Sequence, residues 1–177
     1  MLAIKQQKEP MPKKLIQGFS LVELLIVVAI VAIIVGLTMT NLSFFDRILL
    51  RAELNKLHAT CVYAQRCAMA VNKKQVITFD KRNKAYTFNG HRQKLARVVD
   101  FGVIVGAKGP PSSPNQAIGS PITFKDEQIV FEPNGVIGAG TVYLVDAKKR
   151  SMCALSCGIS QVSFLRKYRY DNKWRLI

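Results

Sequence analysis

One carboxylate lies inside the longest apolar run of the sequence. From Phe19 to Met39 the only strongly polar side chains are those of Ser20, Glu23 and Thr38. As a helix, the 21 residues of this run would span about 31 Å, which matches one hydrocarbon core. A carboxylate in lipid is costly unless a positive group neutralises it. Glu23 is therefore a candidate docking group for a cation on another molecule.

The apolar side chains of this run outweigh the cost of its acid. Fourteen of the 21 residues are Leu, Ile, Val or Phe. On an insertion scale they contribute roughly −4 to −8 kcal/mol, whereas one central acid costs about 3 kcal/mol. Insertion is therefore favourable. The simpler alternative to a docking role is a signal-anchor in which Glu23 only reaches back to the membrane interface.

The flanks of the run predict its orientation. Four lysines precede it: Lys5, Lys8, Lys13 and Lys14. Positive charge marks the cytoplasmic side, so the N-terminus should be cytoplasmic and the rest exported. A secretory signal carries its small-residue cleavage site after the apolar core, whereas here Gly18 precedes it. The sequence predicts a cleaved cytoplasmic leader at residues 1–18 and a single transmembrane helix at residues 19–40.

The junction itself resembles a known processing signal. Gly18-Phe19-Ser20-Leu21-Val22-Glu23 and the apolar run behind it resemble the class III signal of type IV pilins and type II secretion pseudopilins, over residues 13–42. The resemblance implies a bacterial inner-membrane protein that prepilin peptidase cuts after Gly18 and methylates at Phe19. It further implies that Glu23 pairs with the terminal amine of a neighbouring subunit, and that an inner-membrane assembly platform takes part.

A second helical stretch, the amphipathic stem, is predicted at residues 41–72. Apolar side chains recur there at intervals of three and four: Leu50, Leu54, Leu57, Cys61, Ala64, Ala68 and Val71. A coiled coil is one interpretation. We favour a helix laid against a sheet, because the small residues of its second half allow close approach. Span and stem form either one continuous helix or two helices bent near Gly36 or Asn41.

The remaining residues, 73–177, predict a β-rich periplasmic head. Its expected strands are short runs: Val76–Asp80 paired with Ala85–Asn89, Leu95–Val105, Ile122–Phe124, Gln128–Phe131, Thr141–Val145, Met152–Leu165, and a last hairpin over 166–177 turning at Asp171-Asn172. Residues 106–121 are rich in Gly, Pro and Ser and predict a surface loop. Runs this closely spaced imply antiparallel pairing. The predicted fold class is α+β, with the helix and its stem packed on antiparallel sheets.

The head is similar to a narrower group. The apolar pattern ending in Phe131-Glu132-Pro133-Asn134-Gly135, then residues 140–145 and a C-terminal strand pair, resembles the GspH/FimT group of minor pseudopilins and minor pilins. This resemblance implies two antiparallel sheets on the helix and a minor subunit of a type II secretion pseudopilus or a type IV pilus. Some members bind DNA near a C-terminal strand through a Gly-Arg pair. The corresponding residues here, 160–165, read SQVSFL and lack it.

Basic residues dominate the chain, with 26 Lys and Arg against 11 Asp and Glu. Five of them crowd the tail, where Tyr168, Tyr170 and Trp174 alternate with them: Arg166, Lys167, Arg169, Lys173 and Arg175. Such a composition suits phosphate contacts and base stacking, so a pilus-borne DNA receptor is the alternative function. In the competing interpretation the aromatic rings face the core and the basic side chains are solvated.

The four cysteines leave three interpretations open. Cys61 and Cys67 are separated by about 9 Å of helical rise, and Cys153 and Cys157 by about 13 Å of straight strand, so neither pair bridges directly. A disulfide between helix and strand is one interpretation, and buried apolar packing is the second. A four-cysteine metal site is the third and weakest, because neither pair has the two-residue gap usual in such sites.

Catalysis has little support in the sequence. His58 and His91 are its only histidines, and neither lies beside a nucleophile motif. Phosphate-binding and dinucleotide-binding glycine motifs are absent. We therefore expect no enzymatic activity, no cofactor and no metal, with a membrane-anchored enzyme as the weakest alternative.

The processing signal makes a direct prediction about the mature chain. In cells that hold prepilin peptidase, residues 1–18 should be absent, and the first residue should be a methylated Phe19. Intact-mass and N-terminal fragment analysis of membrane-extracted protein measures both features. Retention of Met1 to Gly18 in such cells would contradict the prediction.

Overall fold

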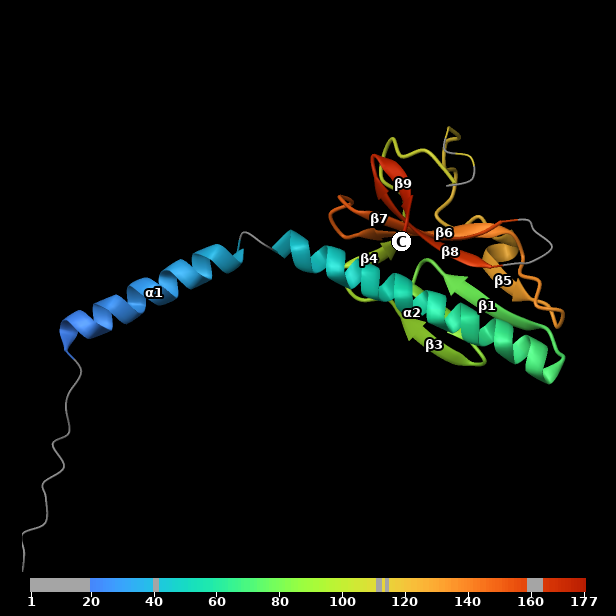
Figure 1. Cartoon of the computed structure of the whole chain (residues 1–177), viewed down its shortest axis with the longest axis horizontal. Coiled ribbons are helices and arrows are strands. Elements are labelled where there is room, and N and C mark those ends of the chain that lie inside the picture. The colour runs from blue at the N-terminus through green and yellow to red at the C-terminus, as the bar shows by residue number, and fades with distance from the viewer. Residues whose placement is uncertain (1–19, 40–41, 111–112, 114, 159–163) are drawn as a thin grey trace, which may run out of the picture. The chain divides into compact units, whose positions relative to one another are not determined.

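A computed structural model describes residues 20–39, 42–110, 113, 115–158 and 164–177 (Figure 1). The chain divides into two compact units, Met1–Asn41 and Leu42–Ile177. The first contains helix α1, Leu21–Met39, and the second contains helix α2, Leu42–Val71, followed by all of the strands. The predicted span and stem are thus two helices, and residues 40–41 lie outside the described residues.

Helix α1 begins at a capped end. The Ser20 hydroxyl accepts a hydrogen bond from the Val22 N–H (3.2 Å), and the Ser20 carbonyl accepts one from the Leu24 N–H (3.1 Å). These are the bonds of an N-cap residue. The side chains from Leu21 to Val35 are exposed. Over the described residues, none of the helices combines the length and the apolar character needed to cross a membrane.

Helix α2 buries the stripe that the sequence predicts, except at its end. Six of the seven stripe residues are buried: Leu50, Leu54, Leu57, Cys61, Ala64 and Ala68. Val71 is 59% exposed, which corrects the prediction. The helix ends there because Asn72 adopts a left-handed φ of 51° and the Lys73 N–H bonds back to the Ala68 carbonyl at 3.1 Å.

Two antiparallel sheets follow α2. The first has the order β3-β2-β1-β5, with β1 Gln75–Asp80, β2 Ala85–Phe88, β3 His91–Lys94 and β5 Gln128–Phe131. The second has the order β4-β6-β7-β8-β9, with β4 Val99–Phe101, β6 Gly140–Asp146, β7 Met152–Cys157, β8 Leu165–Asp171 and β9 Lys173–Leu176. The α+β class, with an N-terminal helix and antiparallel sheets, is confirmed.

The main core lies between α2 and both sheets (Figure 1). The helix contacts β1 and β5 of the first sheet and β4, β6, β7 and β8 of the second. Cys61, Ala64 and Ala68 are fully buried at this interface. Small side chains let the sheets approach the helix closely, as the composition of the stem predicts.

The second sheet is buried on both faces. Cys153 and Leu155 of β7 face the main core, whereas Met152 and Ala154 belong to a separate cluster on the opposite face. Part of the predicted surface loop covers that cluster: Ala107 and Gly109 are buried, and Ile118 packs against it. The loop prediction is therefore wrong for these residues. A composition rich in Gly and Pro predicts that a segment turns, but it does not predict whether the segment packs against a hydrophobic cluster.

Four strand predictions also need correction. The predicted strand Ile122–Phe124 is not formed, since only Ile122 makes an isolated bridge, to Val142. The apolar run Leu95–Val105 holds only the three-residue strand β4, because its remaining apolar side chains pack from irregular segments. The run Met152–Leu165 is not one strand: β7 ends at Cys157 and β8 begins at Leu165. Strand β3 was not predicted at all, since His91–Lys94 carries no apolar residue and pairs only through its backbone with β2.

The start of β6 makes a stability prediction. A Cβ added at Gly140 would lie 2.5 Å from the Phe124 ring and 2.9 Å from its Cα. We expect Gly140→Ala to lower the free energy of unfolding by about 1–3 kcal/mol through overpacking. Thermal unfolding of the full chain in detergent, followed by circular dichroism, measures the loss.

The matched control is Gly119→Ala, since a Cβ there meets no atom within 4 Å. Its melting temperature should equal that of the parent chain. Equal melting temperatures for both variants would contradict the packing described around Phe124.

Candidate functional site

The predicted docking group, Glu23, lies in the first turn of α1. It is three residues after the N-cap Ser20, the position where a capping-box acid can bond back to the cap. Its negative charge also suits the positive end of the helix dipole. Glu23 thus has a local role available besides docking. The predicted processing residues Gly18 and Phe19 lie outside the described residues.

The predicted DNA-binding residues form a β-hairpin, β8–β9, with its turn at Asn172 as the sequence indicates. Arg169 pairs with Arg175 and Asp171 with Lys173 across the two strands. By strand alternation, four basic side chains share one face: Lys167, Arg169, Lys173 and Arg175. Arg166 points to the other face, where its guanidinium lies 4.5 Å from the Phe164 ring centroid.

The aromatic residues of this hairpin pack inward. Tyr168, Tyr170 and Trp174 pack against the second hydrophobic cluster. The Trp174 Nε1–H donates to the Lys108 carbonyl at 2.7 Å, which ties the hairpin to the covering segment. This arrangement matches the competing interpretation of the tail, in which rings face the core. Stacking on unpaired bases would require these rings to leave their contacts.

The basic face of β8 runs along one flank of α2. Lys167 donates through Nζ to Asn55 Oδ1 at 2.9 Å. One turn further along, burial and then the nearby Lys167 charge lower the pKa of His58, while a hydrogen bond with the Leu165 backbone raises it. In the other direction along the helix, the charges of Arg51 and Arg169 both act on Cys153. The Lys167–Asn55 hydrogen bond therefore ties β8 to α2.

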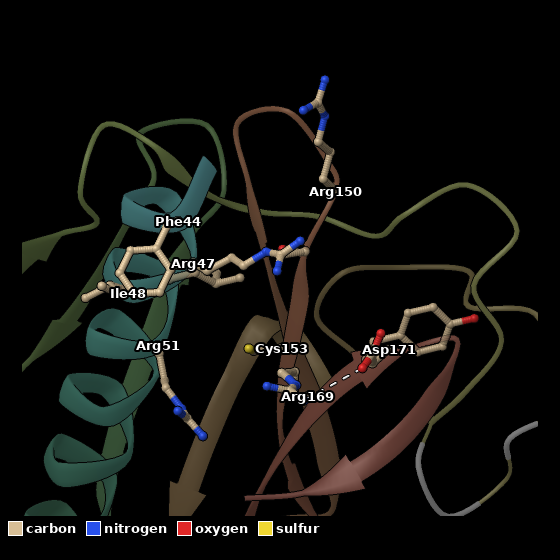
Figure 2. Close-up of a pocket in the computed structure, with 11 residues that line it drawn as sticks. Phe44, Arg47, Ile48, Arg51, Arg150, Cys153, Arg169 and Asp171 are labelled. Atoms are coloured by element: carbon tan, nitrogen blue, oxygen red, sulfur yellow. Dashed lines mark ion pairs between the residues drawn. The ribbon is translucent and has the colours of Figure 1, made fainter. Parts of the chain in front are cut away.

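A pocket opens where this flank reaches the first turns of α2 (Figure 2). We call it the arginine pocket, after four of its lining residues: Arg47, Arg51, Arg150 and Arg169. Phe44 and Ile48 also line it, with Cys153 and Asp171 on the strand side, and its volume is about 330 Å³. Sequence reasoning missed this site because its arginines come from a helix, a turn and a strand that are far apart along the chain.

The four cysteines are free thiols in the structure. Cys61, Cys153 and Cys157 are buried. Burial raises the pKa of the Cys61 thiol, and the neighbouring Cys157 raises it further. Burial raises the pKa of Cys153 to about 11 against the lowering effect of Arg51 and Arg169. A disulfide from helix to strand stays a prediction. Cys67 is only partly buried.

The described part of the chain holds no candidate metal site. Among those residues, no set of three or more His, Cys, Asp or Glu side chains could hold a metal ion. His58 lies on α2, and His91 opens β3.

Comparison with known proteins bears on the N-terminal segment alone. Residues 13–39 match the prokaryotic N-terminal methylation motif. No curated protein and no solved structure matches the chain. The motif supports a type IV pilin-like protein, and it implies processing by prepilin peptidase and assembly with other pilins. It ends before the head begins, so it does not distinguish one pilin group from another.

Proposed function

We propose that this protein is a minor pilin or pseudopilin, a structural subunit rather than an enzyme. The observation that carries the proposal is the methylation motif at residues 13–39 joined to a capped helix with Glu23 in its first turn. Two antiparallel sheets on a single long helix match the head that the GspH/FimT resemblance implies. The machine it serves would be a type II secretion pseudopilus or a type IV pilus.

Membrane anchoring is proposed for residues 19–40, with the N-terminus cytoplasmic and the head periplasmic. Helix α1 supports this proposal through its composition and exposure. Its only charged residue is Glu23, and its large apolar side chains from Leu21 to Val35 are 47% to 74% exposed. A helix that is apolar all round needs a lipid or protein environment around it. In assembly, the helices of neighbouring subunits would replace the lipid.

The docking step depends on charge. A carboxylate and an α-amine that are both placed in lipid are each unfavourable alone. Pairing Glu23 with the terminal amine of the next subunit neutralises both groups and fixes the axial position of one subunit on another. Removing one partner of such a buried pair costs about 3–5 kcal/mol, because the other charge stays unpaired.

The substitution Glu23→Gln distinguishes the role of Glu23 in docking to another subunit from its role in capping helix α1. Glutamine can serve in a capping box as glutamate does, but it carries no charge. We expect this variant to be processed normally and to enter filaments at least about tenfold less than the parent chain, as loss of a buried ion pair requires. Quantitative immunoblotting of sheared filaments against the membrane fraction measures the ratio.

The matched control is Ser20→Ala, which removes the cap at a cost of about 1 kcal/mol but keeps the charge of Glu23. Its incorporation should stay close to that of the parent chain. Normal incorporation of Glu23→Gln would contradict the docking role. If Ser20→Ala lowered incorporation into filaments more than Glu23→Gln did, Glu23 would be assigned to capping alone.

A second candidate function, a DNA receptor for uptake, is favoured by one observation. The four basic side chains Lys167, Arg169, Lys173 and Arg175 share a face of the hairpin, opposed there only by Asp171. A row of cations on one face suits the spacing of phosphates along a strand. Because the neighbouring rings are packed, such binding would rest on phosphate contacts and show little sequence preference.

Two arginines of this hairpin provide a matched test. Arg175 lies on the basic face and Arg166 on the other, and both are exposed. If the face binds duplex DNA, Arg175→Ala should weaken binding by about three- to tenfold and reduce the salt slope by about one. Arg166→Ala should change neither quantity. Gel shifts with the full chain across a salt series measure both, and absence of a shift at low salt would remove this candidate.

A further inference from the structure

We propose that the arginine pocket binds the phosphate headgroup of an anionic phospholipid. The inference rests on the proposed function in one respect, the membrane anchoring of residues 19–40. It concerns a different part of the chain, namely the first turns of α2 and the strand ends that face them. The positive charge of the pocket favours an anion as its ligand. Its apolar rim, and its short distance along the chain from the proposed anchor, favour a lipid.

The described residues balance the positive charge of the pocket only in part. Among the described residues, Arg169 is the only one of the four arginines with a carboxylate partner, Asp171 at 3.7 Å. Arg47, Arg51 and Arg150 form no ion pair with a described carboxylate. Asp46, which precedes Arg47 on α2, is not their partner either, because its carboxylate pairs with Lys148 at 3.7 Å. Several guanidinium groups around one cavity repel each other until an anion enters.

The geometry suits a phosphate group. Figure 2 shows Arg47 extending from α2 toward the strands, with Arg169 and Cys153 on the strand side. Arg51 and Arg169 line the pocket together with Cys153, and both charges lower the pKa of that thiol. Guanidinium groups bind phosphate oxygens through two parallel hydrogen bonds, which is why arginine is common at phosphate sites. A volume of about 330 Å³ falls within the range of small-ligand pockets.

The rim of the pocket favours a lipid over a soluble anion or a nucleic acid. Phe44 is 60% exposed and Ile48 is 47% exposed, and both line the cavity. Phe45 and Leu49, their neighbours on the first turns of α2, are also exposed. A site for free phosphate gains nothing from exposed apolar side chains, and the aliphatic side chains of Ile48 and Leu49 offer no stacking surface for the bases of DNA. A lipid presents a phosphate and acyl chains side by side, which matches guanidinium groups beside Phe44 and Ile48.

Few residues along the chain separate the first turns of α2 from the proposed anchor. Two residues, 40 and 41, lie between Met39, the last residue of α1, and Leu42, the first of α2, and Arg47 is five helical residues further on. Extended chain and helical rise together allow no more than about 20 Å over that distance. If residues 19–40 span the membrane, Arg47 and Arg51 cannot be far from the headgroup layer. Attraction of Lys and Arg to anionic lipid acts over this range.

The test uses the full chain in nonionic detergent with added phospholipid. Native mass spectrometry records how much phosphatidylglycerol and phosphatidylcholine the protein retains across a concentration series. We expect phosphatidylglycerol to be retained at about tenfold lower concentration than phosphatidylcholine, as one charge-assisted bidentate contact allows. Equal retention of the two lipids would overturn the proposal.

Three double variants test whether the preference for phosphatidylglycerol over phosphatidylcholine arises at the arginine pocket. Arg47→Gln/Arg51→Gln should reduce phosphatidylglycerol retention to the phosphatidylcholine level. The control Arg82→Gln/Arg97→Gln removes the same charge from exposed positions outside the pocket and should leave retention unchanged. Arg47→Lys/Arg51→Lys keeps the charge and the fold but not the bidentate geometry, and its retention should be intermediate. A preference that survives Arg47→Gln/Arg51→Gln, or that falls equally in the control, would overturn the proposal.

Competitors distinguish the sources of phosphate. Inorganic phosphate or a short DNA duplex that displaces phosphatidylglycerol at equal concentration would assign the pocket to a free anion or to nucleic acid, and would overturn the lipid assignment. Failure of the proposed function is a separate result. A subunit methylated at Phe19 and incorporated into filaments, yet without lipid preference, overturns this inference alone. A lipid preference in a chain that is never processed overturns the proposed function and supports the pocket.

Discussion

The proposed assembly depends on how the charge of Glu23 is neutralised in an apolar environment. Helix α1 carries a single charged residue, Glu23, among exposed aliphatic side chains. Ser20 and the helix dipole supply a local electrostatic reason for an acid at that position, worth about 1 kcal/mol. That amount does not offset about 3 kcal/mol for an acid in the membrane core. The rest of this cost has to be offset by the apolar residues around Glu23 or by a positive group on another subunit. Only a positive group on another subunit gives the acid a function.

The head follows a different physical rule, which is close packing against a helix with small side chains. Cys61, Ala64 and Ala68 bring α2 near both sheets, and the second sheet is covered again on its far side. This leaves α2 with two distinct ends. Its C-terminal half packs in the core, whereas its first turns carry exposed Phe44, Phe45 and Ile48 beside Arg47 and Arg51, which pair with no carboxylate of the described residues. One helix therefore contributes both to the packed core and to an exposed surface of mixed apolar and basic character.

The sequence predicted the features that repeat locally. Local signals, namely a period or a turn motif, mark the apolar run, the stem stripe from Leu50 to Ala68 and both hairpins. It did not predict β3, whose residues His91–Lys94 are polar, or the covering role of Ala107 and Gly109, because these depend on distant partners. The arginine pocket escaped for the same reason. Its residues lie on α2, in the β6–β7 turn and on β8, and only the tertiary fold brings them together.

A reconstruction of the assembled filament at side-chain resolution would test the ion pair most directly. The measured quantity is the distance from the Glu23 carboxylate to the terminal nitrogen of Phe19 in the adjacent subunit. The account predicts an ion-pair distance of about 4 Å or less between subunits. A Glu23 side chain that bonds back to the Ser20 backbone of its own helix, with no amine of another subunit near it, would contradict the account.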